Sequence, residues 1–236
     1  IEHAFWYVNN REDIMEEEIE KVTNTGTCKE AKTTSDEIQI NNDEFSNSYI
    51  PPVVAMLPLL AKNTEEMNKI CAKMGNSVEK LFEEKISIVF KMIGYSVELK
   101  GQGYGRVPDG IAICHEYGYA LIFDAKVRQD GYRVGRDDRA IKEYINRETQ
   151  TLKKQGIRNV YFVIVSSDFK GDFDDVIRNI KIETDARELV FLEAKGLLTI
   201  LEQRLRNPEI DLGPSGIQNL FVQSGILTNK DVKEFL

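Results

Sequence analysis

Two short apolar segments in the middle of the chain constrain its fold more than any other feature. The first, at about residues 110–115, directly follows Asp109, and the second, residues 119–126, is apolar until it reaches Asp124. A tight turn between them predicts an antiparallel pair of strands. In such a pair the start of the first strand lies beside the end of the second, so we expect Asp109 and Asp124 to be neighbours.

The charged residues at this predicted sheet end suit a particular chemistry. Lys126 follows Asp124 by two residues, so both side chains project from one face of the strand. Two converging carboxylates favour Mg²⁺, and the main-chain carbonyl of Ala125 can add a ligand. The ion would promote ionisation of a water and neutralise charge on a phosphate, while Lys126 would stabilise the transition state. We therefore predict metal ligands at Asp109, Asp124 and Ala125, with Lys126 as a catalytic partner.

A simpler interpretation treats Asp109 as part of an ordinary turn, and Asp124 and Lys126 as a surface ion pair. Against it, the two charged residues directly follow the apolar sequence ALIF, where burial of charge without a purpose is costly.

The remaining pattern alternates helices with apolar strands. The predicted elements are a helix over 77–93, a strand over 95–99, a helix over 136–154, a strand over 159–167, a helix over 172–181, a strand over 189–191, and helices over 193–206, 214–223 and 228–235. The continuous apolar run at 159–167 is typical of a central strand buried on both faces. This order predicts an α/β fold with a mixed central β-sheet flanked by helices.

The N-terminal third has a different character. Of the net charge of −8, residues 1–76 carry −7. Residues 12–22 predict an acidic helix, residues 23–50 a polar connector, and residues 52–74 short helices. We therefore expect a helical, acidic N-terminal segment at 1–76 and a second domain at 77–236, whose near-neutral charge does not exclude a nucleic-acid partner.

Composition narrows the class of protein further. No apolar run approaches the roughly 18 residues of a membrane span, and no signal pattern precedes the domain. The three cysteines are scattered and form no CxxC pair, which favours a reducing cytoplasm over a zinc site or disulfides. The chain does not start with Met, so we also expect it to be part of a longer protein.

The second domain resembles the cleavage domain of FokI-type type IIS restriction endonucleases, within the PD-(D/E)xK nuclease superfamily. The matching residues, in the family's order, are Gly94-Tyr95, Gly101–Gly105, Pro108-Asp109-Gly110, Asp124-Ala125-Lys126, Gly131-Tyr132, VSSDFKGDF at 165–173 and GILTNKDV at 225–232. The resemblance implies a restriction-endonuclease-like core and Mg²⁺-dependent cleavage of double-stranded DNA at a fixed distance from a site that a separate domain reads. We therefore expect a DNA-recognition domain before residue 1. Two departures are Ala125, where the family usually has a hydroxyl residue, and a shorter segment before residue 159.

The resemblance also suggests roles for residues outside the hairpin. Glu83 matches a helical glutamate that reaches the metal site through water in many such nucleases; Glu79 and Glu84 compete for this role, and an exposed helix residue is the alternative. The cations after Lys126, namely Arg128, Arg133, Arg136 and Arg139, are candidates for DNA phosphate contacts or are simply solvated charges.

The helix at 136–154 occupies the place of the dimerisation helix in this family. Arg139 and Glu143 match its charged pair with the signs exchanged, and a two-fold axis accommodates either polarity. The alternative is an ordinary pair within one helix. We expect a homodimer.

Two other functions stay open at this point. One is a different PD-(D/E)xK nuclease, such as a repair or junction-resolving enzyme. The other is a noncatalytic DNA-binding module that kept the fold, against which Asp109, Asp124 and Lys126 argue because all three are intact.

Overall fold

The computed structural model describes residues 49–100, 107–133 and 138–236. Its elements are α3 (Pro52–Ala55), α4 (Leu57–Lys62), α5 (Glu65–Lys73), α6 (Val78–Ile93), β1 (Ser96–Leu99), β2 (Gly110–Cys114), β3 (Tyr119–Lys126), α7 (Asp138–Lys154), β4 (Asn159–Ser166), α8 (Asp174–Glu183), β5 (Glu188–Glu193), α9 (Ala194–Arg206), α10 (Pro214–Ile217), a 3₁₀ helix η2 (Gln218–Phe221), β6 (Gly225–Leu227) and α11 (Asn229–Phe235). The predicted α/β fold with a mixed sheet and flanking helices is confirmed.

The six strands form one sheet in the order β1-β2-β3-β4-β5-β6. The first three strands pair antiparallel, and β3 to β6 pair parallel. Gly110 lies opposite Phe123 in the β2–β3 ladder, so the start of β2 meets the end of β3 as the sequence predicts. The apolar run of β4 lies in the middle of the sheet and is almost entirely buried.

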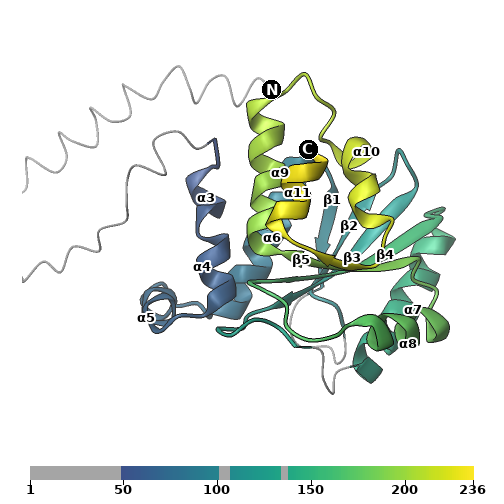
Figure 1. Cartoon of the computed structure of the whole chain (residues 1–236), viewed down its shortest axis with the longest axis horizontal. Helices are drawn as coiled ribbons and strands as arrows, with labels where there is room; N and C mark the ends of the chain where they lie inside the picture. The colour runs from purple at the N-terminus through teal and green to yellow at the C-terminus, as the bar shows by residue number, and fades with distance from the viewer. Residues whose placement is uncertain (1–48, 101–106, 134–137) are drawn as a thin grey trace, which may run out of the picture. The chain divides into compact units, whose positions relative to one another are not determined.

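Helices cover both faces of the sheet, with α6, α9 and α11 on one face and α7 and α8 on the other (Figure 1). Residues alternate between these faces along a strand. In β3, Leu121 and Phe123 belong to the α6/α9 core, whereas Ala120 and Ile122 belong to the α7/α8 core. Even-numbered positions of β3 therefore face α7, and Asp124 and Lys126 continue this series.

The short N-terminal helices pack into the main core. Helices α3 and α5 contact α6, and α4 contacts both α6 and α9. Val54, Leu57, Leu60 and Cys71 are buried in the core that α6 and α9 share. The boundary at residue 76 stays a prediction, and the helix predicted over 12–22 lies outside the described residues.

The prediction for residues 214–223 was wrong in detail. Only the first four of them form an α-helix, which continues as the 3₁₀ helix η2. Tertiary contacts hold this segment, because the Tyr119 hydroxyl donates a hydrogen bond to the Pro214 carbonyl. The strand β6 was also missed, since three residues at a sheet edge carry too little periodicity to predict a strand.

Gly110 is required where β2 crosses the ring of Phe123. A Cβ atom at this position would overlap that ring and would lie 2.9 Å from the main-chain oxygen of Glu98. The glycine that follows Asp109 is therefore fixed by packing, and it lets the chain enter the strand at the point where the charged residues gather.

We expect Gly110→Ala to destabilise the protein by about 1–3 kcal/mol, because the added methyl group overpacks a well-filled core. Urea denaturation measures the loss. In a Phe123→Leu background the smaller side chain should relieve part of this penalty. An equal penalty in both backgrounds would contradict the steric explanation.

Candidate active site

Asp109, Asp124 and Lys126 converge at one end of the strands, where β2 begins and β3 ends. Oδ2 of Asp109 accepts a hydrogen bond of 2.5 Å from the main-chain N–H of Ala125. Nζ of Lys126 lies 2.5 Å from Oδ2 of Asp124, and Asp124 is close enough to Asp109 for its charge to raise the pKa of Asp109. The neighbourhood predicted from the hairpin is therefore present, and Lys126 pairs with one of the two carboxylates, that of Asp124.

The electrostatics of this cluster centre on Asp109. Burial raises its pKa, the nearby Asp124 carboxylate raises it further, and the Ala125 N–H partly opposes them; the pKa moves from 3.8 to about 8. Asp124 itself is only 4% exposed. Two carboxylates in this setting repel each other, so without a cation the pair holds a proton near neutral pH.

This pKa predicts how the metal-free protein responds to pH. The folded pKa lies above the unfolded value, so the contribution of Asp109 to stability is fully present below about pH 4 and is lost as pH rises to about 8. In EDTA, the free energy of unfolding should therefore fall over this range relative to Asp109→Asn, which cannot ionise. Denaturant titrations at several pH values test this, and a constant difference between the two proteins would rule it out.

Glu83 approaches the cluster from α6. Its charge is one of the causes that raise the pKa of Asp109, although a smaller one than burial or Asp124. Glu83 is half-buried. The structure thus brings Glu83 within electrostatic range of the two aspartates, while its predicted role through a water stays a prediction.

The predicted cationic residues have varied positions. Arg128 and Arg133 are exposed on the segment after β3, and the Arg128 guanidinium donates to the Val127 carbonyl at 2.8 Å. Arg136 and the side chain of Arg139 lie outside the described residues. Glu143 is exposed on α7.

Tyr144 on α7 is a site residue that sequence reasoning missed. Its hydroxyl donates a hydrogen bond of 3.1 Å to Oδ2 of Asp124. Burial, and then the negative charge of Asp124, raise its pKa well above 10.0, so the hydroxyl stays a donor. Tyr144 lies on the apolar stripe of its helix, and this periodicity alone does not distinguish it from a core tyrosine.

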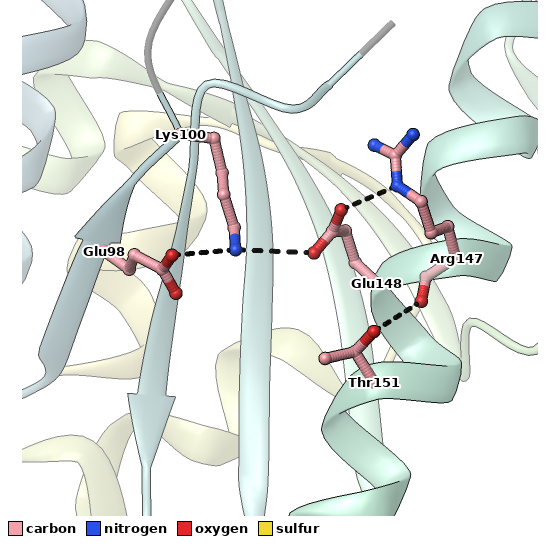
Figure 2. A network of polar contacts seen from close by, with 5 residues as sticks. All are labelled: Glu98, Lys100, Arg147, Glu148 and Thr151. Atoms are coloured by element: carbon pink, nitrogen blue, oxygen red, sulfur yellow. Dashed lines mark hydrogen bonds and ion pairs between the residues drawn. The ribbon is translucent and has the colours of Figure 1, made fainter. Parts of the chain in front are cut away.

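A second missed cluster lies around Lys100, which directly follows β1 (Figure 2). Nζ of Lys100 lies 2.9 Å from Oε1 of Glu98 and 3.5 Å from Oε2 of Glu148. Glu148 is only 7% exposed, and its other oxygen accepts a 3.0 Å hydrogen bond from Nε of Arg147. Glu148 and Lys100 are distant in sequence, so no local pattern could pair them.

A cavity of about 240 Å³ lies at the opposite end of these strands, where the β2–β3 turn meets α10. None of the predicted site residues line it. The charged cluster instead lies at the other end of β3, where Lys126 has 22% of its side chain exposed.

The fold is that of a restriction-type nuclease domain, as comparison with known proteins shows. The model of the FokI cleavage domain matches residues 57–228, and the chain belongs to this family. No curated protein sequence matches the chain. Within the described residues, no helix is long and apolar enough to cross a membrane.

Two solved structures illustrate the likeness. The structure of the restriction endonuclease FokI superposes with a TM-score of 0.56 and 19% identity, over 72% of this chain and 30% of that one. The structure of FokI bound to DNA gives a TM-score of 0.60 and 19% identity, over 83% of this chain and 34% of that one. The chain thus spans about a third of the length of these matched structures.

Proposed function

We propose that this domain is a Mg²⁺-dependent endonuclease that hydrolyses DNA phosphodiester bonds. The observation that carries the proposal is the convergence of Asp109, Asp124 and Lys126 where β2 begins and β3 ends. The family and the similarity in fold to FokI bound to DNA support DNA as the substrate.

The donor set fits a magnesium ion. Mg²⁺ is commonly held by one or two carboxylates, with waters and substrate phosphates completing its ligands. Asp109 and Asp124 would hold the ion with the Ala125 carbonyl. Among the described residues no group of three or more His, Cys, Asp or Glu is placed to bind a metal, so water and phosphate oxygens would supply the remaining ligands. Burial and then the charge of Asp124 raise the pKa of Asp109, and a bound cation would offset both effects.

Bound Mg²⁺ would supply charge neutralisation at the phosphate and a more acidic water. Within this chain, the Lys126 ammonium would polarise the attacking water and stabilise the negative charge of the transition state. Glu83 would assist through a water, and Arg128, Arg133 and Arg136 would hold the DNA backbone beside the site. No covalent intermediate with the protein is needed.

We further propose that the domain is the cleavage part of a type IIS restriction enzyme. In this proposal a separate domain, N-terminal to the chain, reads the DNA sequence. Two copies would associate through Arg139 and Glu143 on α7 to cut both strands. Support comes from the family and from the fact that the chain spans about a third of the FokI structures that it matches.

Cleavage of supercoiled plasmid by the full-length protein tests this function. We expect nicked and linear DNA with Mg²⁺ and none with EDTA, and double-strand cleavage should rise more steeply than linearly with protein concentration. Cleavage without sequence preference and with a linear concentration dependence would favour another type of nuclease. DNA binding without any cleavage would favour the noncatalytic module.

A further inference from the structure

Helix α7 reaches the candidate site at two points on one of its faces. Tyr144 and Glu148 are four residues apart, so their side chains lie on the same side of the helix. Both are buried, with 4% and 7% of their surface exposed. Tyr144 contacts Asp124, and Glu148 contacts Lys100, at the end of the strands that carries the two aspartates.

The first contact holds Asp124 directly. Oδ2 of Asp124 accepts the Tyr144 hydroxyl at 3.1 Å, and the same oxygen lies 2.5 Å from Nζ of Lys126. Two donors on one oxygen fix the rotation of the carboxylate.

The second contact holds the strand beside Asp109. Glu148 pairs with Lys100, whose main-chain N–H donates a hydrogen bond of 3.0 Å to the carbonyl of Asp109. Lys100 thereby extends the β1–β2 ladder to Asp109. Figure 2 shows the Lys100 ammonium between Glu98 and Glu148, so the helix and the strand are tied together at this level.

A contribution to the stability of the fold does not by itself explain the contacts that Tyr144 and Glu148 make. The Lys100–Glu148 pair is partly buried, and such a pair contributes little net free energy because the hydration that the charges lose offsets much of their attraction. The contacts of Glu148 and Tyr144 do, however, fix distances and orientations between helix and sheet. Polar groups that support metal ligands in this way usually set the affinity for the metal.

We propose that α7 positions both site carboxylates, with Tyr144 orienting Asp124 and Glu148 holding, through Lys100, the backbone of Asp109. This inference rests on the proposed Mg²⁺-dependent function. Tyr144, Glu148 and Lys100 are positioning residues in this proposal, since none of them touches the metal or the DNA.

Calorimetric titration of the full-length protein with Mg²⁺ tests the proposal. We expect Tyr144→Phe and Lys100→Met to weaken Mg²⁺ binding by about tenfold each. Lys153→Met is the matched control, because Lys153 is on the same helix but pairs with the exposed Asp185 at 2.9 Å. The control should bind Mg²⁺ as the unmodified protein does.

Plasmid cleavage gives a second measurement. If these residues only stabilised the fold, their replacement would not change the Mg²⁺ dependence of cleavage. In both variants the Mg²⁺ concentration for half-maximal cleavage should rise about tenfold, and saturating Mg²⁺ should restore most of the rate. Unchanged Mg²⁺ affinity with a lower Tm would overturn the positioning role alone. Absence of Mg²⁺ binding by the unmodified protein would overturn the proposed function, and the positioning role with it.

Discussion

Replacing Asp124 by asparagine is expected to reduce DNA cleavage by at least about 100-fold while the protein stays folded. Asparagine has nearly the same volume as aspartate and can still accept the hydrogen bond from Tyr144. It lacks the negative charge that a divalent cation requires. The loss should therefore appear in kcat at ordinary Mg²⁺ concentrations, with circular dichroism unchanged.

Asp185→Asn is the matched control for this substitution. Asp185 is exposed and pairs with Lys153 at the end of α7, so the same chemical change is made far from the site. This variant should cleave at the rate of the unmodified protein. If Asp124→Asn cleaved as fast as the control, the assignment of the site would be wrong.

Replacing Lys126 by methionine is the second change with a large expected effect. Methionine keeps the length of the side chain and removes the ammonium, so we expect kcat to fall by about 100-fold with KM for DNA little changed. Arginine should restore only part of the rate, because its planar guanidinium cannot replace a compact ammonium 2.5 Å from Asp124. Single-turnover cleavage separates these effects from product release.

Lys181→Met provides the comparison for loss of one lysine charge. Lys181 pairs with Glu188 at 2.7 Å and belongs to neither of the two charged clusters described above. We expect it to cleave normally and to bind DNA with nearly the same salt dependence. A larger effect on KM than on kcat for Lys126→Met would instead make Lys126 a simple phosphate-binding residue.

The central part of the fold was predictable because its pattern is local. A short apolar run with Asp109 at its start, and another with Asp124 at its end, define a hairpin whose register follows from the short turn. The long apolar run that became β4 similarly predicted a central strand. These features need no knowledge of distant contacts.

The supporting residues could not be predicted for the opposite reason. Tyr144 and Glu148 meet Asp124 and Lys100 only because α7 packs across the sheet, and helix periodicity shows that a face is buried without showing what lies opposite. The requirement for Gly110 likewise depends on the ring of Phe123 in the next strand.

The most direct test of the central claim is a crystal structure of the protein with Mn²⁺, located by its anomalous scattering. The account predicts one ion or a pair of ions in contact with the carboxylates of both Asp109 and Asp124. A fully occupied Mn²⁺ site elsewhere in the domain, with these two carboxylates left uncoordinated, would contradict it.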